Sequence, residues 1–188
     1  MDRKFDPKKI PLLNDPKRLE YLDPDFIWEK AGLKNPQVLV DIGAGTGFFA
    51  LVFSGKMKGG RIYACDVSGE MTGWMEQNLP PESRGRIIPL KMEETSVPLP
   101  DGVADLVYMI NLHHELEDPL NTLKEAYRLL KEGGKLMIID WKKEATPQGP
   151  PLEIRYTEDE IGRQMRECGF TGPGKYAIPY HHFLIGRK

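Results

Sequence analysis

The sequence is poor in cysteine, in excess positive charge and in long apolar runs, and each shortage excludes a class of protein. Only two cysteines, Cys65 and Cys168, occur in 188 residues and neither belongs to a CxxC pair, so a disulfide framework is excluded and a reduced, cytoplasmic chain is expected. Lys and Arg number 26 against 28 Asp and Glu, so nucleic acid is not an expected partner. The longest uncharged run, residues 42–55, is shorter than the ~18 apolar residues of a membrane span, and residues 1–6 lack the apolar core of a signal peptide.

Short apolar segments alternate along the chain with segments of helical spacing. The apolar segments are largely uninterrupted by polar residues, as expected of parallel strands that helices bury on both faces. This alternation over about 100 residues predicts an α/β doubly wound sheet, and we expect a single domain over residues 1–188. The expected strands are residues 38–40, 61–65, 86–91, 106–110 and 135–140, followed by a hairpin of 175–178 and 181–186.

Capping residues mark the ends of the expected helices. Asp23 and Pro24 predict a helix start, and Gly32 predicts the end of the same helix. Thr157 and Glu160 have the spacing of a capping box. The expected helices cover residues 24–31, 48–53, 68–78, 119–130 and 158–168, with the glycines at 133–134 and 169 ending the last two units.

A glycine-rich loop, residues 41–47 (DIGAGTG), follows the first expected strand. Ligands of doubly wound sheets bind at the carboxyl ends of strands, and glycine lets a ligand approach the backbone closely. Asp66 stands 21 residues after Gly45, at the end of the second strand, where its carboxylate can accept hydrogen bonds from ribose hydroxyls. The loop and Asp66 together predict a site for a cofactor that contains a nucleoside.

The spacing of the glycines distinguishes two cofactor classes. The dinucleotide fingerprint is GxGxxG, whereas this loop reads GxGxG with its third glycine at Gly47. Asp41, directly before the glycines, suits S-adenosylmethionine (SAM), because a carboxylate pairs with the ammonium group of SAM and would repel a pyrophosphate. The loop therefore favours SAM over NAD, although three glycines alone can also form a simple strand–helix turn.

Residues 38–47 (VLVDIGAGTG) resemble motif I of class I SAM-dependent methyltransferases. Residues 97–105, 112–119 and 128–136 resemble later segments of that family in the same order. Together they resemble the methyltransferase type 11 group, relatives of the ubiquinone and menaquinone biosynthesis methyltransferases, over roughly residues 15–186. The resemblance implies a Rossmann-like, three-layer α/β/α fold whose seven-stranded sheet is mostly parallel with an antiparallel last strand.

The resemblance also implies contacts with the cofactor, residue by residue. Gly43, Ala44 and Gly45 would line the methionine part of SAM. Asp66 would hold the ribose hydroxyls, and Val67 would pack on the adenine.

Three further cofactor contacts are implied by the resemblance. Glu93 and Glu94 occupy the segment that contacts the adenine amino group, and Asn111 would meet the methionyl group through its backbone. The chain departs from the family pattern in two places, because residues 78–86 leave little room for the third helix and the final hairpin after residue 169 is short. Both departures are expected to alter the acceptor pocket.

His113 and His114 follow the fourth expected strand and are candidate catalytic residues. An imidazole can accept a proton from an acceptor O–H or N–H as the methyl group arrives. Adjacent residues point in different directions, so at most one is expected to reach the acceptor, and the other would cap a helix or pack on the sheet. His181 and His182 must face opposite sides of the last strand, so one of them is expected in the pocket. No ligand spacing supports a metal site.

Aromatic side chains are candidate walls of an apolar acceptor pocket. Trp141, Tyr156 and Tyr180 are the candidates after the fifth strand, with His181 beside them, although scattered aromatics also occur as core residues.

Two segments are candidate lids over the site. Residues 1–32 are expected to form a helical cap, in which residues 8–22 have too few apolar side chains for a core element. We expect 8–22 to act as a lid with Tyr21 on its inner face, excluding water from the site. The long loop of residues 144–156 is a second candidate.

The sequence therefore predicts transfer of a methyl group from SAM to a small acceptor, apolar or aromatic, with S-adenosylhomocysteine as product. The sulfonium makes the methyl group electrophilic, so the enzyme mainly has to position the acceptor in line. The alternatives are a non-catalytic SAM-binding protein that acts by interaction and, third, an NAD-dependent oxidoreductase. The acceptor and the oligomeric state are not predicted.

Overall fold

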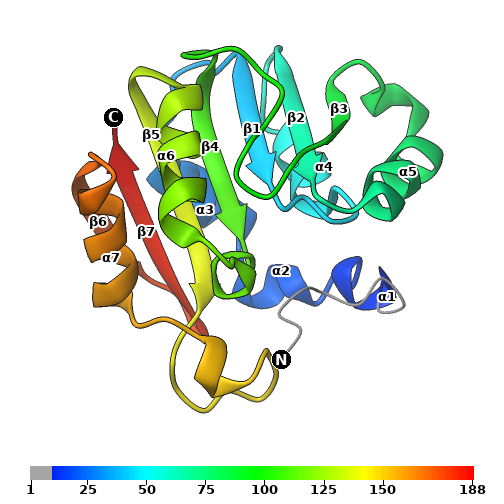
Figure 1. Ribbon diagram of the computed structural model, residues 1–188. Coiled ribbons are helices and arrows are strands. Elements are labelled where there is room, and N and C mark those ends of the chain that lie inside the picture. Colours follow the sequence, from blue (N-terminus) through cyan, green and yellow to red (C-terminus); the bar gives the residue numbers. More distant parts are fainter. Residues whose placement is uncertain (1–9) are drawn as a thin grey trace.

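The computed structural model describes residues 10–188, and its centre is a seven-stranded sheet in the order β3-β2-β1-β4-β5-β7-β6 (Figure 1). Neighbours among β1 to β5 are parallel, whereas β7 is antiparallel to β5 and to β6. The doubly wound, Rossmann-like fold with an antiparallel last strand is thereby confirmed. The strands are β1 (Val38–Ile42), β2 (Arg61–Asp66), β3 (Ile87–Lys91), β4 (Ala104–Ile110), β5 (Leu130–Trp141), β6 (Thr171–Ala177) and β7 (His181–Arg187).

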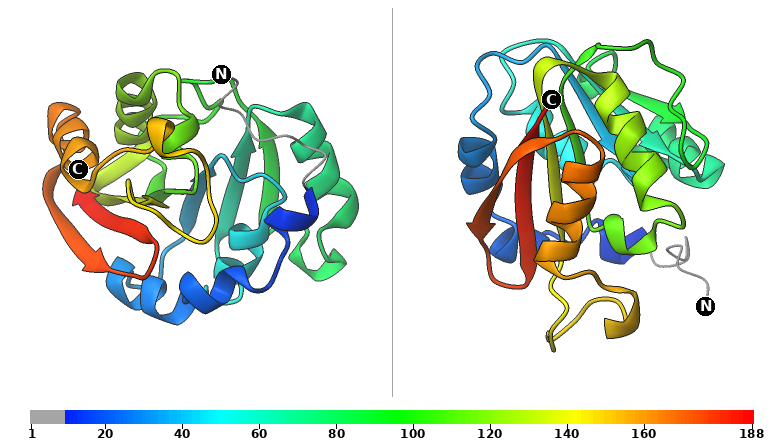
Figure 2. Two further views of the ribbon diagram at one scale, coloured as in Figure 1. Left: turned by 90° about the horizontal axis from the view of Figure 1, so that it is seen from below. Right: turned by 60° about the vertical axis from the view of Figure 1, so that its left-hand side comes forward.

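Helices cover both faces of the sheet and give the expected three layers (Figure 2). One core cluster packs α3, α4 and α5 against one face, and a second packs α6 and α7 against the other. None of the helices in the described part of the chain is long and apolar enough to cross a membrane. The α-helices are α1 (Ile10–Leu13), α2 (Arg18–Tyr21), α3 (Pro24–Ala31), α4 (Phe48–Ser54), α5 (Gly69–Asn78), α6 (Pro119–Leu129) and α7 (Glu158–Glu167), and the 3-10 turns are η2 (Pro81–Ser83), η3 (His113–Glu115) and η4 (Leu152–Ile154).

The predicted helix caps are present. The side chain of Asp23 accepts from two backbone N–H groups at the start of α3, and Gly32 ends that helix in the left-handed conformation. Thr157 and Glu160 form a reciprocal capping box at α7, in which the Glu160 N–H donates to Thr157 Oγ1 (3.2 Å) and the Thr157 N–H donates to Glu160 Oε2 (2.7 Å). These caps explain why the two helices start at the expected residues.

Two strands begin four or more residues before the predicted start. β5 begins at Leu130, directly after α6, so the glycines at 133–134 lie inside the strand instead of ending the helical unit. Backbone pairing explains this: Ala104 pairs with Leu130, and the Lys188 N–H donates to the Gly134 carbonyl (3.0 Å). β6 begins at Thr171, four residues early, because pairing with β7 overrides the weak strand propensity of its glycines and proline.

Residues 10–22 lie beneath the lower edge of the sheet, toward which β1 and β4 point (Figure 1). Most of this segment is half-buried or exposed, but Leu22 is fully buried in the same core cluster as residues of α3 and α4. Residues 8–22 are expected to have too few apolar side chains for a core element, and Leu22 is nevertheless part of the core. Residues 1–9 of the expected cap lie outside the described residues.

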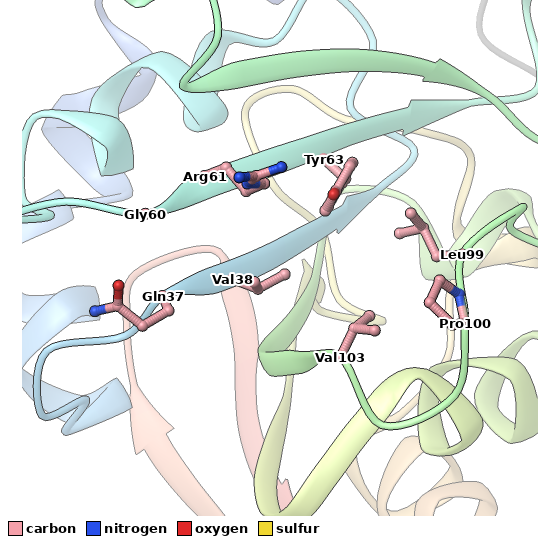
Figure 3. A pocket seen from close by; sticks show the side chains of 8 residues that line it. All are labelled: Gln37, Val38, Gly60, Arg61, Tyr63, Leu99, Pro100 and Val103. Atoms are coloured by element: carbon pink, nitrogen blue, oxygen red, sulfur yellow. The ribbon is translucent and has the colours of Figure 1, made fainter.

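The connection between β3 and β4, residues 92–103, contains no helix. Only η2 stands between α5 and β3, as the short segment at 78–86 predicted. Beside this connection the sheet face is hollowed, and the cavity of about 310 Å³ in Figure 3 is lined by β1, β2 and the connection itself. It lies at the amino-terminal ends of β1 and β2. The lining residues are Gln37, Val38, Gly60, Arg61, Tyr63, Leu99, Pro100 and Val103.

Candidate active site

The carboxyl ends of the parallel strands form one edge of the sheet, called the carboxyl edge below. The glycine loop follows β1, Asp66 ends β2, Asn111 follows β4, and Asp140 lies near the end of β5. Seen from below, α1, α2 and the loop after β5 surround this edge (Figure 2). The topology thus brings the expected site residues of four strands together.

Backbone geometry makes the glycine loop compact. Gly43 and Gly45 have φ of 73° and 55°, a conformation that other residues rarely adopt. The N–H groups of Gly43 and Ala44 both donate to the Cys65 carbonyl (2.9 Å each), so the loop folds back against the end of β2. The loop then leads directly into α4, with Gly47 as the N-cap residue. This is the expected strand–loop–helix arrangement.

Asp66 fixes the loop to β2. One carboxylate oxygen accepts from the Gly45 N–H and the other from the Ser68 N–H, each at 2.8 Å. Burial raises the pKa of Asp66, and these two hydrogen bonds oppose that shift. Each carboxylate oxygen can accept a further hydrogen bond, so the group that supports the loop can also receive hydroxyl donors.

Asp41 is a fully buried carboxyl group at the base of the loop. Burial raises the pKa of Asp41 well above its usual value, whereas the Tyr108 side chain and the Arg18 guanidinium oppose the rise. Arg18, from α2, is itself buried and lies over the rings of Phe48 (5.2 Å) and Phe49 (4.8 Å). The N-terminal segment therefore carries a positive charge to the glycine loop.

Side chains from two segments cover the glycines. A Cβ atom built on Gly43 would lie 2.5 Å from Cδ1 of Leu112, and one on Gly45 would lie 3.1 Å from Cδ1 of Leu13. Thr46 Oγ1 donates to the side-chain oxygen of Asn14 (2.9 Å), which joins the N-terminal segment to the loop. Because Gly43 and Gly45 lack a Cβ atom, space is left in front of the loop. The flexible side chains of Leu112 and Leu13 reach into that space. These residues fit a ligand that lies against the backbone.

Asn111 has a strained backbone with φ of 60°, directly after β4. Its N–H donates to the Ile139 carbonyl (2.8 Å), while its buried Oδ1 has no partner among residues 10–188. Val67 lies half-buried next to Asp66. Glu93, exposed, and Glu94, half-buried, lie in the turn after β3, and the preceding Met92 donates its N–H to the Asp66 carbonyl (3.1 Å).

His114 forms a buried ion pair with Asp140. Its Nδ1 lies 2.7 Å from Asp140 Oδ1, and its backbone N–H donates to Asp140 Oδ2 (2.6 Å). Burial alone would lower the pKa of His114, but Asp140 and Glu115 raise it to about 9. His114 Nε2 lies 3.6 Å from Glu115 Oε1. The ring of His114 is therefore protonated at neutral pH and holds η3 against the end of β5.

His113 has a different environment from its neighbour. Its Nε2 lies 2.8 Å from Oε1 of Gln164 on α7, its ring packs edge-on against Tyr156 (5.0 Å), and its buried Nδ1 has no partner in the described residues. Burial lowers the pKa of His113, so the ring is neutral. The Gln164 oxygen requires a proton on Nε2, which leaves a lone pair on Nδ1.

Three of the four expected pocket residues meet in one place. Tyr21 stacks on His181 (5.7 Å between ring centroids, 3° between planes), and Trp141 lies 4.2 Å from His181. Tyr180 meets Tyr21 edge-on (5.9 Å). We call these four residues the aromatic cluster. The fourth expected pocket residue, Tyr156, instead packs on His113.

The loop after β5 is tied down by Arg155, which is buried. Its guanidinium donates to the carbonyls of Pro150 (2.8 and 2.5 Å), Lys142 (3.0 Å) and Glu144 (2.9 Å). The same group lies 5.6 Å from the centre of the Trp141 ring. The loop is thus an ordered wall behind the aromatic cluster.

Sequence reasoning did not assign Arg18, Leu112, Gln164 or Arg155 to the site. Asp140 was recognisable as a residue near the end of a strand, but its pairing with His114 was not. Arg18 and Gln164 approach from other elements, and no local pattern marks them. Among residues 10–188, no three His, Cys, Asp or Glu side chains are arranged to hold a metal ion.

Comparison with known proteins decides the family. A family model for a methyltransferase domain, type 11, matches residues 40–138, more than half of the chain. The chain belongs to the type 11 methyltransferase family. It is a SAM-dependent methyltransferase of class I, as the resemblance implied, and the family uses SAM as cofactor.

Individual relatives agree with this assignment. The crystal structure of a SAM dependent methyltransferase from Aquifex aeolicus is 37% identical, has a TM-score of 0.91, and covers 98% of this chain and 99% of its own. The ubiquinone/menaquinone biosynthesis C-methyltransferase UbiE of Laribacter hongkongensis is 29% identical over 131 residues, 69% of this chain and 53% of that protein. Demethylmenaquinone methyltransferase of Thermus thermophilus is 26% identical over 130 residues, 66% of this chain and 58% of that protein. The chain thus spans little more than half the length of these two relatives.

Proposed function

We propose that this methyltransferase acts on a small apolar or aromatic acceptor that binds at the carboxyl edge. The observation that carries the proposal is the aromatic cluster, which lies where β5 ends and β7 begins and is covered by the N-terminal segment. The names of the two relatives refer to quinones, whose rings are planar and carbon-rich. Because the chain covers only part of those relatives, their names indicate a chemical class of acceptor and do not identify the acceptor of this chain.

The cofactor site follows from the residues around the glycine loop. SAM supplies an electrophilic methyl group when bound. In our proposal Asp66 accepts from the ribose hydroxyls, Val67 packs on the adenine, and Glu93 and Glu94 face its amino group.

The methionine part of SAM would lie against the loop itself. Gly43, Ala44 and Gly45 leave room for it, while Asp41 and the backbone at Asn111 meet its charged end. The burial of Asp41 and the orphaned Oδ1 of Asn111 support this part of the proposal, since both groups gain from a polar ligand. Orientation of the acceptor and exclusion of water then account for the rest of the catalysis.

Of the two expected catalytic histidines, we propose His113 as the base for an acceptor that must lose a proton. His113 is neutral and keeps a lone pair on Nδ1, with Nε2 held by Gln164. His114 is already protonated at neutral pH through Asp140, so we propose it as a positioning residue that holds η3. Replacing His113 by Gln should lower kcat and leave the affinity for SAM unchanged.

We propose residues 10–22 as a lid over the site. Leu13 lies on Gly45, Asn14 accepts from Thr46, and Tyr21 lies in the aromatic cluster, so the segment touches both the cofactor side and the acceptor side. When the side chains of Leu13 and Leu112 move away, the glycine loop becomes accessible to SAM. Buried free Cys65 and Cys168 fit the expected cytoplasmic location, which stays part of the proposal.

A methyl-transfer screen tests the proposed function. Release of S-adenosylhomocysteine is measured with quinols, phenols, amines and thiols, and we expect turnover with planar ring compounds. Trp141→Leu should abolish most of that turnover, whereas the control Trp74→Leu, on α5 and outside the aromatic cluster, should not. Turnover confined to charged aliphatic acceptors, or unchanged in Trp141→Leu, would refute the proposal.

A further inference from the structure

His181 is the most deeply buried polar residue of the aromatic cluster. It is the first residue of β7 and pairs with Trp141, the last residue of β5, so it stands at the carboxyl edge. Its relative exposure is 0%, and neither Nδ1 nor Nε2 has a hydrogen-bond partner among residues 10–188. Two unpaired polar atoms on one fully buried ring are an exception among buried side chains, which normally find partners.

The unpaired ring of His181 destabilises the fold. Burial lowers the pKa of His181 to about 3, so the ring is neutral and carries one N–H donor and one lone-pair acceptor. Each buried group without a partner forfeits the hydrogen bond it makes with water in the unfolded chain. A phenylalanine would fill nearly the same space between Tyr21 and Trp141 without this disadvantage. Packing alone therefore does not account for a histidine here.

The neighbours of His181 define what fits beside it. Tyr21 lies parallel to the imidazole and Trp141 is tilted against it, so the ring is enclosed by flat apolar surfaces. Tyr21 belongs to the short helix α2 of the N-terminal segment and is only half-buried. Trp141 is held in place from behind by Arg155. Of the two flat surfaces, the one from Tyr21 is therefore the one that can move aside and open the imidazole to an acceptor.

We propose that His181 recognises a hydroxyl group on a planar acceptor, which reaches a nitrogen at the edge of the imidazole when Tyr21 moves aside. This inference rests on the proposed function and adds the group that the acceptor must carry. A hydroxyl both donates and accepts, so it satisfies a neutral imidazole nitrogen in either tautomer. His181 is thus a specificity-determining residue, one of whose unpaired nitrogens gains its partner from the acceptor. The stability that the fold loses through His181 is retained for this recognition.

His181→Phe tests this inference, with His182→Phe as the matched control. His182 is the next residue, faces the opposite side of β7 and lies near Glu158 (4.0 Å), outside the aromatic cluster. Each protein is saturated with S-adenosylhomocysteine and titrated with two probes, 1-naphthol and 1-methylnaphthalene, which differ in the hydroxyl. Binding of S-adenosylhomocysteine to each protein is measured first, by calorimetry.

We expect the wild type and His182→Phe to bind 1-naphthol about tenfold more tightly than 1-methylnaphthalene, the contribution of one neutral hydrogen bond. In His181→Phe the preference should vanish while 1-methylnaphthalene binds as before. The Tm of His181→Phe should rise by about 2–4 °C, because two unpaired buried groups are removed.

The inference would be overturned by a wild type that does not distinguish the probes, by a His181→Phe variant that keeps the preference, or by a lower Tm for that variant. Failure of the proposed function has a different signature, since it would appear as absent turnover in the methyl-transfer screen whatever the probes do. Loss of S-adenosylhomocysteine binding in His181→Phe would place the residue on the cofactor side and would also overturn the inference.

Discussion

The buried pair of His114 and Asp140 makes the stability of this protein depend on pH above neutrality. The ordinary pKa of a histidine is about 6.5, and despite burial, pairing with Asp140 and Glu115 raises the folded-state pKa of His114 to about 9. That difference corresponds to roughly 3 kcal/mol of stabilisation of the charged pair. Because the folded-state pKa is the raised one, this stabilisation is fully present below about pH 6.5 and is lost as the pH rises through about 9.

Asp140→Asn isolates this contribution. Without the carboxylate, only Glu115 still raises the pKa of His114 against the effect of burial, so the variant has less stability to lose from this ring between about pH 6.5 and 9.5. Urea unfolding followed by tryptophan fluorescence gives the free energy of unfolding of both proteins. We expect the wild type to exceed the variant most at about pH 6.5, and the difference to shrink by up to roughly 3 kcal/mol by about pH 9.5.

Asp105→Asn is the matched control for this experiment. Asp105 accepts from the N–H groups of Gln37 (2.7 Å) and Val38 (2.9 Å) and from Lys131 (2.6 Å), with no histidine in the group. Its pKa is lowered by these partners despite burial, so it titrates in acid, and its loss should destabilise the protein equally at about pH 6.5 and 9.5. If the difference in free energy of unfolding between the wild type and Asp140→Asn is the same at about pH 6.5 and 9.5, the ion pair is refuted.

Other features of the site give further expectations. Asp66→Ala should weaken SAM binding about 30- to 1000-fold by calorimetry, since two charge-assisted hydrogen bonds are lost, and an unchanged affinity would mean that the ribose is held elsewhere. Arg155→Met should make trypsin cleave at Lys142 about tenfold faster, because the loop loses its central donor, and an unchanged cleavage rate would contradict that role. Hydrogen exchange in residues 12–22 should slow when S-adenosylhomocysteine is added, whereas exchange that is slow in both states would show a fixed segment instead of a lid.

Local sequence signals were sufficient for the arrangement of elements. Capping residues such as Asp23 and Thr157 fixed helix starts, because a cap depends only on side chains a few residues away. The early starts of β5 and β6 were missed because they depend on pairing with β4 and β7 and not on local propensity.

Much of the cofactor side of the site, and the three pocket residues Tyr21, Trp141 and His181, could be placed from the sequence, but the partners of the two candidate catalytic histidines could not. The glycine loop and Asp66 follow strands, so the topology determines where they lie. The partners of His113 and His114 come from residues 51 and 26 positions away, and nothing in the local sequence selects Gln164 or Asp140. The gathering of Tyr21 with Trp141 likewise depends on the path of the N-terminal segment across the carboxyl edge.

The helix-free connection between β3 and β4 leaves the sheet uncovered at the edge opposite the carboxyl edge. The hollow that it leaves lies at the amino-terminal ends of β1 and β2, opposite the glycine loop, and is lined by half-buried side chains such as Tyr63 and Val103 (Figure 3). An extra helix inserted at residues 99–103 would cover these side chains and would leave Met92, whose N–H bonds to the Asp66 carbonyl, in place. We therefore expect an insertion or label at this end of the domain to leave methyl transfer at the carboxyl edge unchanged.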